Sequence, residues 1–130
     1  MRLTGATRYG LLAVAYIAQN QDKGIIISKD VSKNYNIPWE NLQQILGRLV
    51  RARILQGKRG PRGGFSLARP AAKITMLEII EAIEGSFDVS LGFEECAARE
   101  KFAAKAERLY TKAFAQSRQA LKKVKLSDLI

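Results

Sequence analysis

The chain has 130 residues, with 47% hydrophobic and 26% charged side chains, which suits one globular domain with an appendage. Its single cysteine excludes an internal disulfide, and the lack of histidine and of any Walker, nucleophile-elbow or dinucleotide motif argues against an enzyme. The net charge of +10 is concentrated in residues 1–73, which carry 13 Lys and Arg against 3 Asp and Glu, so a polyanion is the expected partner.

The N-terminal segment predicts a helix rather than a membrane span or a signal peptide. Its apolar stretch is too short to cross a bilayer, and it lacks a small-residue cleavage site, so we expect a cytoplasmic protein without a membrane partner. Apolar residues recur with helical spacing up to about residue 20. The predicted inward face comprises Tyr9, Leu12, Ala13, Tyr16 and Ile17.

The next segment predicts a helix-turn-helix. Ser28 is the expected N-cap of a short helix from Lys29 to about Tyr35, and Pro38 suits the first turn of a second helix over about 38–52. The outer face of that second helix is rich in amides and arginines, as in a recognition helix that enters the DNA major groove by its N-terminal end. Its inward residues are expected to be Leu42, Ile45, Leu46, Leu49 and Val50.

A Gly-rich hairpin follows. Short strands near residues 54–55 and 65–67 flank a loop over 57–64 that carries three cations and no acid, and this completes a winged helix. Guanidinium groups fit a narrow, electronegative minor groove, and a proline limits the entropy lost when such a loop becomes ordered. The wing residues expected to bind DNA are Lys58, Arg59, Pro61 and Arg62.

The full set of expected DNA contacts combines these wing residues with base readers and phosphate contacts. Gln and Asn can pair with adenine and Glu with cytosine, whereas arginines further along the helix suit phosphates. Trp39 is either a reader or a core residue. The set comprises Arg2, Ser28, Trp39, Glu40, Asn41, Gln43, Gln44, Arg48, Arg51, Lys58, Arg59, Pro61 and Arg62.

The segment ITMLEIIEAIEG predicts the clearest helix. Thr75 and Glu78 form a capping box, Gly85 is a C-cap, and a loop over about 86–96 follows. The predicted buried stripe comprises Met76, Ile79, Ile80 and Ile83.

A near-heptad apolar stripe from about Ala97 to Lys123 predicts a long helix. Its apolar face is too wide for a small domain to bury alone, so we expect it to pack against its twin in a homodimer, with packing on the first helix of the same chain as the alternative. The expected dimer contacts are Phe102, Ala106, Leu109, Tyr110, Ala113, Phe114 and Leu121. The closing KLSDLI predicts a short capping turn or helix.

The predicted fold is mainly α: a winged helix-turn-helix with a two-stranded β-wing and a long C-terminal dimerisation helix. Residues 1–85 would form the DNA-binding domain, 86–96 a sensor-type loop, and 97–130 the dimerisation helix with its C-terminal cap.

Four segments of the sequence resemble the Rrf-type family of bacterial regulators, which is the IscR, NsrR and CymR type. They are MRLTGATRYGLLAVAYIA, LQQILGRLVRARIL, KRGPRGGFSLARPAAKITMLEIIEAIEG and LKKVKLSDLI, and in order they cover nearly the whole chain. The resemblance implies a nucleoid-associated homodimer, a repressor or an activator, on an A·T-flanked palindrome of double-stranded DNA. It implies that Arg59 lies in the minor groove and that residues 39–44 read the major groove.

The sequence departs from the family at the loop that holds an iron–sulphur cluster in some members. Those members carry three cysteines there, whereas this loop has only Cys96, and Arg8 stands where some have an acidic ligand. One thiolate cannot hold a cluster that needs about four protein ligands, so we expect no cofactor and no metal site. The chain is then a cluster-free member with another, unknown effector, or a variant whose cysteines were replaced. Cys96 is a redox sensor or an incidental thiol.

Two other functions compete with duplex DNA binding. The basic Gly-rich arm could bind single-stranded RNA, although Phe65 is its one aromatic residue for stacking. The long helix could also serve a purely structural interaction domain.

Overall fold

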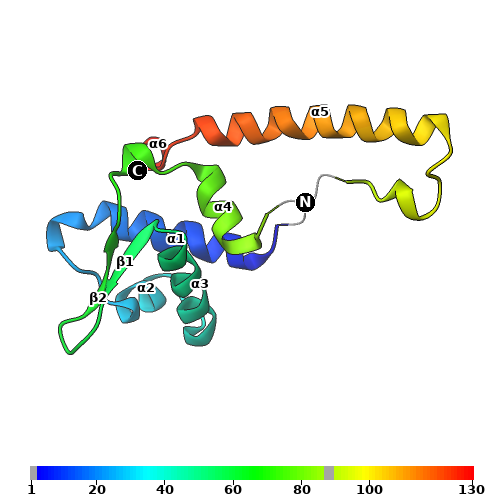
Figure 1. Ribbon diagram of the computed structural model, residues 1–130. Helices are drawn as coiled ribbons and strands as arrows, with labels where there is room; N and C mark the ends of the chain where they lie inside the picture. The colour runs from blue at the N-terminus through cyan, green and yellow to red at the C-terminus, as the bar shows by residue number, and fades with distance from the viewer. Residues whose placement is uncertain (1–2, 87–89) are drawn as a thin grey trace.

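The computed structural model describes residues 3–86 and 90–130 (Figure 1). The elements in chain order are α1 (Gly5–Gln19), the 3-10 turn η1 (Gln21–Lys23), α2 (Ser28–Tyr35), α3 (Trp39–Arg51), β1 (Leu55–Lys58), β2 (Gly64–Leu67), η2 (Ala71–Lys73), α4 (Met76–Glu84), η3 (Phe93–Glu95), α5 (Lys101–Lys123) and α6 (Leu126–Leu129). This order confirms the predicted winged helix. Arg2, an expected DNA contact, lies outside the described residues. Within them, no helix combines the length and apolarity that crossing a membrane requires.

One hydrophobic core lies where α1, α3 and α4 meet. Four of the five inward residues predicted for α3 are buried, and Val50 is half-buried at the margin of the core. On α4 the stripe includes Leu77 where the sequence predicted Met76, which is only half-buried. Burying each of these large apolar side chains stabilises the fold by about 1.5–3 kcal/mol.

The buried face of α1 is rotated from the predicted one. Its buried apolar positions are Gly10, Ala13, Val14, Ile17 and Ala18, whereas Tyr9, Leu12 and Tyr16 lie at the core margin. The cause is close packing, because a Cβ on Gly10 would overlap Cδ1 of Ile83 on α4. Small residues on α1 thus let the two helices approach more closely than aromatic residues would allow.

Three helix starts also differ from prediction. Ser28 is the first residue of α2 rather than its cap; Ile27 holds the cap position, without a side-chain bond. The extended backbone of Ile27 follows from its neighbour Ile26, whose N–H and C=O both bond Phe65 at 2.8 Å. Pro38 lies just before α3 rather than in its first turn. The long helix α5 begins at Lys101, not Ala97.

The wing is an antiparallel pair in which Leu55 faces Leu67 and Lys58 faces Gly64. Ile26 extends it by one bridge to Phe65, so the wing is anchored to the segment before α2. A side chain on Gly64 would place its Cβ 2.5 Å from the Ile26 carbonyl oxygen, and glycine is therefore required there.

The N-terminus of α4 is fixed by the predicted capping box. The Thr75 hydroxyl accepts from the Glu78 N–H at 3.1 Å, and the Glu78 carboxylate accepts from the Thr75 N–H at 3.0 Å. Burial alone would raise the pKa of Glu78, but the Thr75 backbone hydrogen bond and the nearby Arg69 outweigh it and lower the pKa. Gly85 caps the other end through its N–H to the Glu81 carbonyl.

The long helix α5 lies over α4 and, together with the loop before it, extends well beyond the winged-helix part of the chain (Figure 1). Its inner side is covered by its own chain: Ala103 and Phe114 are buried, and Tyr110 stacks on Phe114 with ring centroids 6.1 Å apart. An ion pair of 2.6 Å joins Arg118 to Glu81 of α4. After α5 the chain turns back, and the Leu126 N–H donates to the Ile74 carbonyl at the start of α4.

We predict that Gly10→Ala destabilises the protein. The overpacking against Ile83 costs about 1–3 kcal/mol, which exceeds the gain of about 1 kcal/mol in helix propensity. Urea denaturation measures the change. Ile83→Val removes the overlapping Cδ1, so the double variant should be more stable than the sum of the single effects implies. Strict additivity would contradict the proposed contact.

Candidate nucleic-acid interface

A groove of about 730 Å³ lies between α3, the start of α2 and the wing. It brings together six of the expected DNA contacts, which are Ser28, Trp39, Gln43, Arg51, Lys58 and Arg59. Its remaining lining includes Ile27 and Val50, which sequence reasoning did not assign to a site, and Phe65, which it considered only for stacking with RNA. These residues are apolar, and the packing of the wing against α3 and against the segment before α2 brings them together.

Trp39 is 46% exposed and lines the groove, so it is not a core residue. Gln43, one turn further along α3, shares this wall of the groove. Glu40, Asn41 and Gln44 are exposed on the same N-terminal half of α3 but lie outside the groove lining. The groove therefore presents an aromatic ring and one amide, with further polar groups around the helix end.

The wing loop and α3 project on the same side of the molecule, away from α5 (Figure 1). Pro61 and Arg62 are exposed in the loop that joins the strands. The two ion pairs of the described residues, Arg69–Glu78 and Arg118–Glu81, leave the wing cations and Arg51 uncompensated. This side of the molecule consequently presents a positive field.

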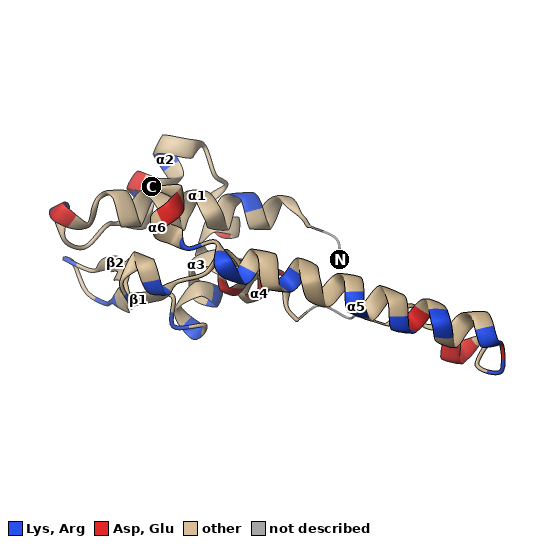
Figure 2. Cartoon of the chain, turned by 90° about the horizontal axis from the view of Figure 1, so that it is seen from above, with Lys and Arg blue, Asp and Glu red and all other residues tan. Residues whose placement is uncertain are grey.

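Cations are not confined to that side, because α5 carries seven Lys and Arg and one acid, Glu107. Figure 2 shows these basic residues along α5. The acids that balance residues 74–130 lie mainly in α4 and in the loop before α5. The net positive charge therefore lies in residues 1–73, as predicted, but the basic side chains themselves also occur on α5.

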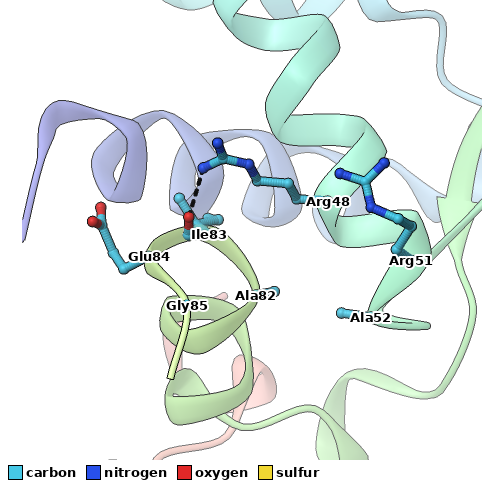
Figure 3. A pocket seen from close by; sticks show the side chains of 7 residues that line it. All are labelled: Arg48, Arg51, Ala52, Ala82, Ile83, Glu84 and Gly85. Carbon is cyan, nitrogen blue, oxygen red and sulfur yellow. Dashed lines mark hydrogen bonds between the residues drawn. The ribbon is translucent and has the colours of Figure 1, made fainter. Parts of the chain in front are cut away.

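Arg48 faces α4 rather than the groove. Its guanidinium reaches across a cleft of about 530 Å³ and donates to the Ile83 carbonyl at 2.7 Å (Figure 3). A cation at a helix C-terminus also interacts favourably with the helix dipole. Of the two arginines expected to contact phosphates, Arg51 lines the groove and Arg48 instead joins α3 to the end of α4.

The next residue of α4 binds the start of α1. One oxygen of Glu84 accepts from the Thr4 hydroxyl and the Thr7 hydroxyl, both at 2.6 Å, and from the Thr4 N–H at 3.1 Å. The Thr4 and Thr7 hydroxyls lower the pKa of Glu84, and the charge of Arg48 contributes further. The residues involved are far apart in sequence, so no local pattern signalled this contact.

The expected dimer contacts divide into two groups. Phe102, Leu109 and Ala113 are exposed, whereas Ala106, Tyr110 and Leu121 are half-buried. Phe114 is buried within its own chain, so its side chain is not free for a partner. The exposed members follow at intervals of seven and four residues and form one edge of α5, here called the outer edge.

The donor set does not fit an iron–sulphur cluster. The sequence holds one cysteine and no histidine, and Cys96 is an exposed free thiol. Among residues 3–86 and 90–130, no three side chains of the His, Cys, Asp and Glu types are grouped so as to hold a metal ion. Iron–sulphur clusters are held by about four ligands, mainly thiolates.

Comparison with known proteins gives a consistent match. A family model described as "Rrf2: Iron-dependent Transcriptional regulator" matches residues 3–130. A helix-turn-helix-type transcriptional regulator of Neisseria meningitidis is 38% identical over 90 residues, which cover 69% of this chain and 61% of that protein. IscR of Cereibacter sphaeroides is 38% identical over 86 residues, or 65% of this chain and 56% of IscR.

Among solved structures, CymR, the global cysteine regulator of B. subtilis, superposes with a TM-score of 0.79 over 99% of this chain and 95% of CymR. The two sequences are 24% identical, so this likeness shows the fold alone. The chain spans about three fifths of the length of the Neisseria relative.

Glu84→Gln should lower the free energy of unfolding by about 1 kcal/mol at pH 7, since an amide accepts weaker hydrogen bonds and solvent screens a half-buried group. Because folding lowers the pKa of Glu84 below its ordinary 4.5, the charge stabilises the protein above that pH, and this contribution is lost as pH falls through the folded-state value. Denaturation curves of the variant and wild type should therefore converge in acid. Glu94→Gln, an exposed control, should show no difference; a pH-independent gap for Glu84→Gln would contradict the assignment.

Proposed function

Because this chain belongs to the Rrf2 family of transcriptional regulators, we propose that it represses transcription by binding a palindromic operator as a homodimer. The proteins of this family are DNA-binding regulators rather than enzymes. The observation that carries the proposal is the groove that unites the N-terminal half of α3 with the wing cations.

Each side of the groove suits a different part of a duplex. The N-terminal half of α3 would enter the major groove, with Gln43 and Trp39 against base edges and Glu40, Asn41 and Gln44 beside them. Lys58, Arg59 and Arg62 would meet the minor groove, with Pro61 stiffening the loop. Ser28 and Arg51 would contact phosphates.

The burial of Phe65, the one aromatic residue of the wing, favours duplex DNA over single-stranded RNA as the partner. Phe65 is half-buried and its backbone is bonded to Ile26, so it offers no free ring for base stacking. A purely structural domain is disfavoured by cations that face solvent without acids, since a structural role does not need them.

The homodimer is supported by apolar surface that the single chain leaves exposed. Phe102 and Leu109 on the outer edge of α5 are 59% and 55% exposed. A second apolar depression of about 490 Å³ runs along α1, lined by residues that include Leu11, Leu12 and Leu129. We propose that a second copy covers both surfaces, since apolar surface of this extent is unfavourable in water.

The palindrome follows from the dimer, because a twofold protein presents the same reading surface to two half-sites. Occupancy of an operator that overlaps a promoter would be sufficient for repression, since the bound protein would exclude the transcription machinery. In the proposed division, residues 1–85 bind DNA, 86–96 form the sensor-type loop, and 97–130 form the dimerisation helix and cap. Selection of duplexes from a random pool, followed by transcription in vitro from a template carrying the selected site, tests the whole proposal.

Arg59→Ala should weaken binding to a selected duplex by about 1–3 kcal/mol, because the guanidinium is lost from the minor groove. Fluorescence anisotropy at fixed salt measures the affinity. Arg99→Ala removes an equal charge from an exposed position outside the groove and serves as the control. Equal losses for the two variants would mean that the wing contributes only general charge.

Leu109→Asp should convert the dimer to a monomer, because it places a charge within the apolar contact of the outer edge. Sedimentation velocity measures the association state. Thr111→Asp is the matched control, since it adds the same charge to the same helix on the opposite edge. A wild-type monomer, or a Leu109→Asp dimer, would exclude this interface.

A further inference from the structure

We propose that this protein binds its operator independently of iron, because contacts within the chain fasten the loop before α5 where an iron-dependent member of the family would need a metal centre. The inference rests on the proposed DNA binding. It concerns residues 90–100 and the first turns of α5. It departs from the family description, which names its members iron-dependent.

The first argument is the chemistry of the available donors. An iron–sulphur cluster needs about four ligands, mostly thiolates, and this chain has one thiol and no imidazole. Even a dimer that brought both copies of Cys96 together would supply only two thiolates. Carboxylates in the loop do not make up the difference, because they are hard oxygen donors and iron–sulphur clusters select soft sulphur ligands.

The second argument is a carboxylate that already binds the loop. The Leu91 N–H donates to Glu107 Oε1 at 2.7 Å, and the Ser90 hydroxyl donates to the same oxygen at 3.4 Å. The Ser90 hydroxyl in turn accepts from the Gly92 N–H at 3.0 Å. Hydrogen bonds to a charged acceptor are about twice as strong as neutral ones, so this contact can hold a short loop.

Glu107 is the sole acid among the 23 residues of α5, whose other charged side chains are seven Lys and Arg. Glu107 forms no ion pair with the cations that the structure describes, and its carboxylate instead accepts from N–H and O–H groups of the loop. It is therefore placed to hold the loop. We call Glu107 with Ser90 and Leu91 the loop latch.

An aromatic contact closes the other end of the loop. Phe93 and Phe102 meet edge to face, with ring centroids 5.8 Å apart and an interplanar angle of 80°. Such pairs are stabilising beyond their buried area. Between these contacts the backbone forms its own turns, with Ala97 N–H bonded to Phe93 O at 2.7 Å and Glu100 N–H bonded to Ala97 O at 3.0 Å.

The latch therefore sets the start of α5 without a metal. Phe102 belongs both to this aromatic contact and to the outer edge that we assign to the dimer, so the loop conformation and the dimer surface are joined at one residue. The spacing of the two reading surfaces would then depend on protein contacts, since residues 3–86 and 90–130 offer iron no site through which to alter it.

The decisive experiment treats the purified protein anaerobically with ferrous iron and sulphide and measures iron content, visible absorption and affinity for the selected duplex. We expect no cluster absorption, substoichiometric iron, and an affinity unchanged within about a factor of two. Stoichiometric iron with a cluster spectrum, or an affinity change of about tenfold or more, would overturn the inference. Failure to bind any duplex in either state would instead overturn the proposed function.

A second measurement tests the latch itself. Glu107→Ala should abolish the hydrogen-exchange protection of the Leu91 amide, and Glu107→Gln should restore part of it, because the amide oxygen still accepts. Glu95→Ala, an exposed acid of the same loop, is the control and should leave Leu91 protected. Unchanged protection in Glu107→Ala would show that the latch does not hold the loop.

Discussion

The end of α4 is the joint on which the other parts of the structure depend. There Ile83 packs over Gly10 of α1 and accepts a hydrogen bond from Arg48 of α3, and Glu84 holds the first turn of α1. The last two residues of α4, Ile83 and Glu84, thus contact both α1 and α3, which are distant from α4 in sequence. The contact of Arg48 with Ile83 links α3 to this helix end, in addition to the turn between α2 and α3.

The same joint stands at the entrance to the loop before α5. Gly85 ends α4 immediately after Glu84, and the chain then leads through the loop latch into the long helix. In the chain, α4 lies between the winged-helix elements and α5, and both of its ends are fixed by hydrogen bonds. At its other end the capping box, Arg69 and the returning C-terminal segment hold α4 against the core.

Local signals in the sequence were sufficient for several elements. The capping box at Thr75 and Glu78, the inward stripe of α3 and the Gly-rich wing each follow from patterns within a dozen residues. The rotated face of α1, the role of Arg48 and the burial of Phe114 did not follow from such patterns. Each of these depends on what a neighbouring helix presents, and helical periodicity alone carries no information about that partner.

The bridge between Ile26 and Phe65 has a consequence for how operators can vary. Two backbone hydrogen bonds, one in each direction, fasten the wing to the segment leading into α2, and this limits the movement of the wing relative to α2. Each protomer would then measure a fixed distance along the duplex between its major-groove and minor-groove contacts. Tolerance for different operator lengths would have to come from rotation of whole protomers about their shared axis, so natural sites should differ in the spacer between half-sites and not within them.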